Sequence, residues 1–116
     1  MKIAVDAMGG DFAPKEIVAG AILAAKRYDC EIVLVGDQTQ IQKELDKNYP
    51  EWRKSTISIH HASDVVGMGE HPGVAVRRKK DSSIVVATRL VKEGKCDAVL
   101  SAGNTGAAAA SALFIL

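Results

Sequence analysis

The chain alternates between short apolar runs and segments whose apolar residues have helical spacing, and this alternation constrains its fold more than any other feature. Apolar runs cover residues 2–5, 31–35 and 97–101, and residues 56–60 alternate as a strand does. Residues 17–25 repeat apolar side chains at i, i+3 and i+4, which gives a helix one apolar face. Strands that are apolar on both faces are typical of a parallel sheet covered by helices. We therefore predict an α/β fold, a doubly wound αβα sandwich with a mostly parallel sheet and right-handed crossovers.

Residues that commonly begin or end helices mark the boundaries between these segments. Pro14 fits the first turn of the first helix, and Asp37 is suited to cap the second. Either Asp81 or Ser82 is expected to cap a further helix, which Gly94 would end. The chain therefore carries start and stop signals at the spacing that alternating strands and helices require.

Composition narrows the classes of function. The 116 residues, 47% of them hydrophobic, suffice for one domain with a real core. A net charge of +1 and an aromatic content of 4% argue against a nucleic acid partner. Cys30 and Cys96 lie far apart without a CxxC pair, which argues against a disulfide framework or a cysteine zinc site and fits a reducing cytoplasm. The sequence has neither a signal-peptide core nor the run of about 18–20 apolar residues that a membrane span needs.

The last segment, residues 107–116, is apolar and has no charged last turn or polar cap. We therefore expect residues 1–116 to be the N-terminal part of a single α/β catalytic domain, truncated inside a helix. Such a piece would expose a sheet edge and an apolar helix face. Its folding is then expected to depend on a second copy or on the missing residues.

In open α/β sheets, ligands bind outside the carboxyl ends of the strands, so the turn at residues 101–106 is the first candidate site. Gly103 and Gly106 let backbone N–H groups approach an anion, and the helix that follows adds the positive end of its dipole. The side chains of Asn104 and Thr105 are further donors. The same pattern also fits a tight strand–helix connection in which these two residues only cap the helix.

The turn after the first strand carries two carboxylates, Asp6 and Asp11, on either side of Gly9 and Gly10. Paired carboxylates serve acid–base chemistry or hold a metal, and they equally cap helices or orient a neighbouring loop. Because carboxylates that line an anion site repel the ligand, we expect Asp6 to orient other donors rather than contact phosphate.

The segment from about residue 61 to residue 80 is predicted to be a loop, and it ends in the four consecutive cations of residues 77–80. These cations are suited to hold a phosphate or to meet an acidic partner, and a solvated loop explains them equally well. His71 is a candidate acid or base in this loop, and His61 with Asp64 is a weak candidate for a metal site. P-loop and dinucleotide-binding patterns are absent.

Three segments in order along the chain carry a resemblance to a known family: KIAVDAMGGDFAPKEIV (2–18), AVRRKKDSSIVVA (75–87) and CDAVLSAGNTGAAAA (96–110). Together they closely resemble the bacterial phosphate acyltransferases (PlsX, acyl-ACP:phosphate acyltransferases). The resemblance spans essentially the whole chain and about the first third of such a protein. The pair DAMGGD and SAGNTG is far more specific than a single glycine motif.

This resemblance implies an enzyme that moves a fatty acyl group from acyl carrier protein to inorganic phosphate, giving acyl phosphate for phospholipid synthesis. It implies a fold like that of phosphotransacetylases and isopropylmalate dehydrogenases. It also implies a cytoplasmic homodimer that associates peripherally with the inner face of the membrane and uses no metal or organic cofactor. The chain by itself is expected to be inactive or nearly so.

Combining the resemblance with the turns assigns roles to particular residues. The residues expected to bind phosphate are Gly9, Gly10, Asp11, Gly103, Asn104, Thr105 and Gly106. Arg77, Arg78, Lys79 and Lys80 are expected to contact either phosphate or the acidic carrier protein. The candidates for a catalytic group are Asp6, Lys79 and Asn104.

Two alternatives stay open at this point. One is a transferase that uses a coenzyme A thioester, as phosphotransacetylases do. The other is a non-catalytic domain that binds an anion or dimerises.

Overall fold

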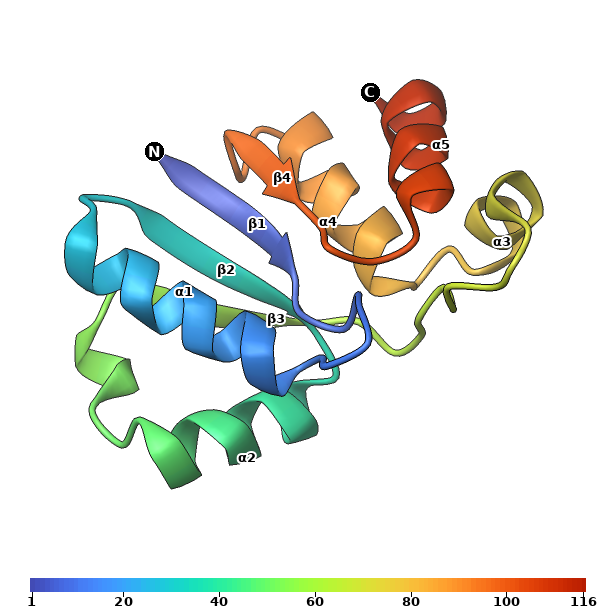
Figure 1. The fold of residues 1–116 in the computed structure, drawn as a ribbon. Helices are drawn as coiled ribbons and strands as arrows, with labels where there is room; N and C mark the ends of the chain where they lie inside the picture. Colours follow the sequence, from blue (N-terminus) through green and yellow to red (C-terminus); the bar gives the residue numbers. More distant parts are fainter.

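The computed structural model describes residues 1–116 and forms a four-stranded, wholly parallel sheet in the order β3-β2-β1-β4. Helices cover both faces of this sheet (Figure 1), so the predicted doubly wound α/β sandwich is confirmed. The elements along the chain are β1 (Lys2–Asp6), α1 (Lys15–Arg27), β2 (Glu31–Gly36), α2 (Gln38–Asn48), a 3₁₀ turn η1 (Trp52–Lys54), β3 (Ile57–His61), α3 (Pro72–Arg78), α4 (Ser83–Lys92), β4 (Ala98–Leu100) and α5 (Thr105–Ile115).

Alternate residues of the central strands face the two helical layers. Leu34 of β2 packs with Ile41 and Leu45 of α2 in the layer that also holds α1, and all three are fully buried. Val33 and Val35 of the same strand face α4 on the other side. Because both faces of β2 are covered, its apolar residues run without a break, which is the pattern that predicted a parallel sheet.

The predicted caps are confirmed where the structure tests them. The Asp37 carboxylate accepts a hydrogen bond from the Gln40 N–H at 3.1 Å and begins α2. Of the two candidates before α4, the cap is Ser82, whose hydroxyl accepts from the Val85 N–H at 3.4 Å. These side chains satisfy N–H groups that the first turn of a helix leaves without partners.

The predicted loop over residues 61–80 is wrong in one part, because residues 72–78 form α3. His71 caps this helix, with its Nδ1 accepting from the Val74 N–H at 3.4 Å, and Pro72 occupies the first helical position. Ala75 and Val76 then pack in a core shared with α4 and α5. Because α3 is short and contains a glycine, its own helix propensity is weak, and packing against α4 and α5 stabilises it.

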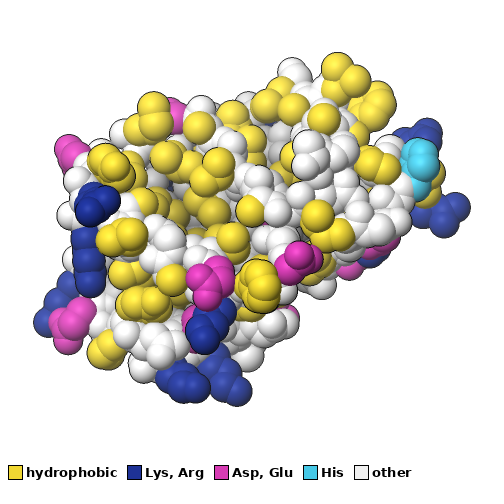
Figure 2. Space-filling view, viewed as in Figure 1, with side chains coloured by type: hydrophobic (Ala, Val, Ile, Leu, Met, Phe, Trp, Pro, Cys, Tyr) yellow, Lys and Arg dark blue, Asp and Glu magenta, His cyan; other side chains and the backbone are white.

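β4 lies at one edge of the sheet and is covered on only one face. Beside α1, an apolar groove of about 630 Å³ runs over β1 and reaches Leu100 and Ala102. Leu100 is 61% exposed, and Leu113 and Phe114 of α5 are also exposed. Figure 2 shows hydrophobic side chains gathered over this part of the surface. Exposed apolar side chains therefore lie both beside β4 and at the end of α5.

No helix of the structure has both the length and the apolar character needed to cross a membrane.

Candidate functional site

The two glycine turns lie side by side at the carboxyl ends of adjacent strands, β1 and β4 (Figure 1). From β1 the chain crosses to β2 through α1 on one face, whereas α4, on the other face, leads back from β3 to β4. The strand order therefore reverses between β1 and β4. This switch point is where open α/β sheets most often bind their ligands.

The turns touch backbone to backbone through Gly9 and Gly103. A Cβ added to Gly9 would lie 2.9 Å from both the Cα and the N of Gly103, and a Cβ on Gly103 would lie 2.8 Å from the Gly9 Cα. Any side chain at either position would push the turns apart. Gly10, at φ 103°, also has a backbone conformation that other residues rarely adopt. The glycines thus bring two segments together that are distant in the sequence.

A short chain of hydrogen bonds joins the same turns beneath this contact. Asp6 Oδ1 accepts from the Met8 N–H at 3.1 Å, and Asp6 Oδ2 accepts from the Ser101 hydroxyl at 2.9 Å. The Ser101 oxygen in turn accepts from the Gly103 N–H at 3.1 Å. Asp6 is only 4% exposed, so its carboxylate lies below the surface of the turns. Asp11, the other predicted carboxylate, is exposed.

The first turn of α5 offers backbone N–H groups that no atom of the chain accepts. Asn104 Oδ1 caps the helix by accepting from the Ala107 N–H at 3.0 Å. The Thr105 and Gly106 N–H groups precede the first bond within the helix and have no acceptor in the chain. The Gly9 and Gly10 N–H groups of the neighbouring turn also have none. Free N–H groups at a helix start and in an adjacent glycine turn form a donor-rich surface suited to an anion.

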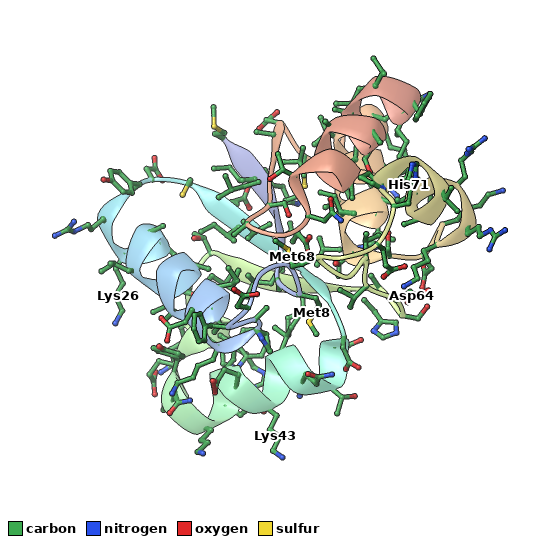
Figure 3. The ribbon with its side chains drawn as sticks, turned by 45° about the vertical axis from the view of Figure 1, so that its right-hand side comes forward. Met8, Lys26, Lys43, Asp64, Met68 and His71 are labelled. Carbon is green, nitrogen blue, oxygen red and sulfur yellow. The ribbon has the colours of Figure 1, made fainter.

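The amide nitrogen of Asn104 is directed toward the loop that precedes α3. Its Nδ2 donates to the carbonyl oxygens of Gly67 at 3.1 Å, Met68 at 3.4 Å and Glu70 at 3.2 Å. Figure 3 shows Met68 in this loop and His71 where α3 begins. Both polar atoms of the Asn104 side chain are thus engaged, one by the helix and the other by the loop.

Lys79 stabilises the same loop from the opposite end of α3. Its Nζ donates to the Val65 carbonyl at 2.8 Å and to the Glu70 carboxylate at 2.7 Å, and that carboxylate also accepts from the Gly67 N–H at 2.6 Å. The hydrogen bond from Lys79 holds the pKa of the Glu70 carboxyl below its usual value, and Glu70 raises the pKa of the Lys79 ammonium. The loop is therefore held in place by Asn104 from one side and Lys79 from the other.

The four cations of residues 77–80 have two different environments. Lys79 is half-buried on the loop, whereas Arg77, Arg78 and Lys80 are exposed. Figure 2 shows basic side chains gathered at the end of the molecule where α3 lies. The structure thus brings Asp6 and the two glycine turns together, and it gives the exposed cations a separate surface on α3 and just after it.

The side chains of His61 and His71, the histidine candidates, each accept a hydrogen bond from a backbone N–H group. His61 Nδ1 accepts from the Gln38 N–H at 3.1 Å, and His71 caps α3. The Asp64 carboxylate accepts from the Val65 N–H at 2.8 Å. No three His, Cys, Asp or Glu side chains gather as a metal ion would require.

Tight packing also explains Gly106 without reference to a ligand. A Cβ at Gly106 would lie 2.9 Å from the Pro72 Cβ, so this glycine allows α3 to pack on the first turn of α5. Sequence reasoning missed this contact, gave no role to Ser101 within the predicted turn, and did not include Glu70 in the site. The one available signal was that Ser101 and Asp6 each end an apolar strand, which places them at one edge of a parallel sheet.

The fold and its two turns define an α/β chain with a candidate anion site at its topological switch point. All of residues 1–116 match the family model described as fatty acid synthesis protein, and the chain belongs to that family. The chain is 62% identical over 116 residues to a protein of Desulforamulus reducens named phosphate acyltransferase, covering all of this chain and 34% of that protein.

Two further relatives carry the same name, phosphate acyltransferase. One, from Pelotomaculum thermopropionicum, is 57% identical over 98% of this chain and 32% of its own length. The other, from Geobacter sulfurreducens, is 53% identical over all of this chain and 33% of its own length. The resemblance found in the sequence is therefore confirmed, and the chain spans about a third of the length of these relatives.

Proposed function

We propose that the whole protein transfers a fatty acyl group from acyl carrier protein to inorganic phosphate, and that this chain supplies the side of the site that binds phosphate. The observation that carries the proposal is the contact between two glycine turns that leave N–H groups unpaired in both. The similarity to proteins named phosphate acyltransferase supports it. The product, an acyl phosphate, would serve phospholipid synthesis.

The proposed reaction is a substitution at a thioester carbonyl. A phosphate oxygen attacks the carbonyl carbon, a C–O bond forms and the C–S bond breaks. The carrier's thiolate leaves and takes up the proton that hydrogen phosphate loses, so that the products are an acyl phosphate and the free thiol. The N–H groups of Gly9, Gly10, Thr105 and Gly106 would hold the phosphate without adding charge near the reacting carbon. Holding the anion in place converts an encounter in solution into a reaction within one complex.

In this proposal Asp6, Lys79 and Asn104, the three candidates for a catalytic group, have structural roles in the site. Lys79 and Asn104 hold the loop before α3, and Asp6 lies beneath the glycine contact. We therefore propose that they shape the site and that phosphate contacts the backbone N–H groups first. Asn104, Gly103 and Asp11 remain predicted phosphate neighbours through their place in the turns.

Arg77, Arg78 and Lys80 are proposed to meet the acidic carrier protein. They are exposed and belong to one short stretch at the end of α3, whereas Lys79 is used by the loop. Surface cations of this kind speed the encounter with an acidic partner in a way that salt weakens. We further propose a cytoplasmic homodimer at the inner face of the membrane, without metal or organic cofactor, as the family resemblance implies.

The proposal is tested with the full-length protein by following phosphate-dependent loss of acyl-ACP and formation of acyl phosphate. Thr105→Pro is the sharpest variant, because proline is well tolerated at the first position of a helix yet removes one of the free N–H groups. Losing one hydrogen bond to a charged ligand is expected to raise the KM for phosphate about tenfold or more. The matched variant Thr105→Ala keeps the N–H and is expected to change this KM far less.

The results separate the alternatives. Transfer from acyl-CoA in preference to acyl-ACP would favour the coenzyme A enzyme. If the folded full-length protein transfers no acyl group to phosphate from either donor, the remaining hypothesis is a non-catalytic domain that binds an anion or dimerises. Equal effects of Thr105→Pro and Thr105→Ala would refute backbone binding at α5.

A further inference from the structure

Asp6 is the only carboxylate that the fold buries, and no cation pairs with it. Removing a carboxylate from water is costly unless hydrogen bonds replace those to water. Replacing buried charged groups by well-packed apolar side chains often leaves the stability of a protein unchanged or raises it. The position of Asp6 therefore calls for an explanation other than stability.

The hydrogen bonds of Asp6 are divided between the two turns. Oδ1 accepts from the Met8 N–H in its own turn, and Oδ2 accepts from the Ser101 hydroxyl 95 residues away. Ser101 then accepts from the Gly103 N–H, two residues further along. The Asp6 carboxylate can only accept hydrogen bonds, and the Gly103 N–H can only donate one. The Ser101 hydroxyl lies between them and must therefore donate to Asp6 and accept from Gly103.

We propose that Asp6 and Ser101 are a positioning pair, the Asp6–Ser101 bridge, that fixes the spacing of the two glycine turns so that both present their N–H groups to one phosphate. The inference rests on the proposed function. It assigns neither residue to the reacting atoms: both act through the backbone of Gly9 and Gly103, which they hold in contact.

Both oxygens of the Asp6 carboxylate are used within the chain, by the Met8 N–H and the Ser101 hydroxyl, so the carboxylate does not line the surface proposed to contact phosphate. Asp6 is 4% exposed, and its Oδ2 lies against Gly9, only 2.7 Å from the position that a Cβ on Gly9 would take. A glycine at position 9 thus lets the backbone of this turn pack directly against the carboxylate. The bridge joins the two turns, while the N–H groups of Gly9, Gly10, Thr105 and Gly106 remain without an acceptor in the chain.

The test compares three serine variants of the full-length enzyme. Ser101→Ala removes the bridge, and Ser101→Thr keeps the hydroxyl. Ser111→Ala is the matched control, because the Ser111 hydroxyl is fully buried and has no hydrogen-bond partner. The measurements are the KM for phosphate, the KM for acyl-ACP and kcat.

Ser101→Ala is expected to raise the KM for phosphate about tenfold or more and to change the KM for acyl-ACP by less than about twofold. Ser101→Thr is expected to restore the KM for phosphate to within about threefold of the wild type, and Ser111→Ala to leave it unchanged. A general loss of stability would not produce a change confined to phosphate and reversed by threonine.

An unchanged phosphate KM in Ser101→Ala, or an equal rise in Ser101→Thr, overturns the bridge while leaving the proposed function intact. A wild-type protein without phosphate-dependent transfer overturns the proposed function itself and the inference that rests on it. Should Ser101→Ala fail to fold, Ser101→Cys is measured by the same criteria, because its thiol fills the space and donates only a weak hydrogen bond.

Discussion

Replacing Asn104 by aspartate separates the two roles that its side chain has in the structure. The introduced carboxylate would still cap α5, because its oxygen accepts from the Ala107 N–H as well as an amide oxygen does. The variant would lose both amide hydrogens that now serve the carbonyls of Gly67, Met68 and Glu70. At about 1 kcal/mol for each of two hydrogens, with added repulsion between oxygens, Asn104→Asp should loosen the loop by about 2–3 kcal/mol.

Hydrogen exchange of the full-length protein measures this loosening locally. In peptides that cover residues 64–71, a loss of about 2 kcal/mol corresponds to exchange about thirtyfold faster. Asn104→Ala, which also loses the cap, should add exchange in the first turn of α5, whereas Asn104→Asp should not. If Asn104→Asp leaves exchange in the loop as slow as in the wild type, the side chain is only a cap and the reasoning about the loop is refuted.

Three further predictions concern the surroundings of the turns. Gly106→Ala should lower the melting temperature, because crowding the proline of α3 costs about 1–3 kcal/mol and outweighs the gain of about 1 kcal/mol in helix propensity. The ion pair of Glu70 and Lys79 has a lowered carboxyl pKa and a raised ammonium pKa. The ion pair should stabilise the loop fully at neutral pH. This contribution should fade below about pH 4, as Glu70 takes up a proton, and above about pH 10.5, as Lys79 loses one. Hydrogen exchange of the loop at acid pH tests the lower limit. Replacing Arg77 and Arg78 by glutamate should raise the KM for acyl-ACP in a salt-dependent way and leave that for phosphate unchanged, and the reverse pattern would assign them to phosphate.

Local sequence signals predicted most of the fold. Runs such as residues 31–35 are apolar because both faces of β2 are covered, and Asp37 begins α2 through a bond within its own turn. These features depend on neighbours in the sequence, so the sequence reveals them. α3 was missed because seven residues with a glycine give a weak periodic signal, and its stability comes from packing with distant helices.

The sequence predicted where the candidate site lies in the fold, but not the hydrogen bonds that join its residues. Both glycine turns follow strands, and the rule for parallel sheets places such turns at one edge. The bond from Ser101 to Asp6 joins residues 95 apart and depends on β1 and β4 being neighbours, which the order of strands along the chain does not reveal. For the same reason, the pattern around Asn104 predicted a cap or an anion ligand and could not predict its bonds to the loop.

The most direct test of the account is a titration of inorganic phosphate into full-length protein labelled with ¹⁵N-glycine, followed by amide chemical shifts. The account predicts saturable shifts at Gly9, Gly10, Gly103 and Gly106, with small changes at Gly94, which lies at the end of α4 away from the turns. Folded protein whose turn glycines do not shift at phosphate concentrations that saturate the enzyme would show that the glycine turns are structural connections and not the phosphate site.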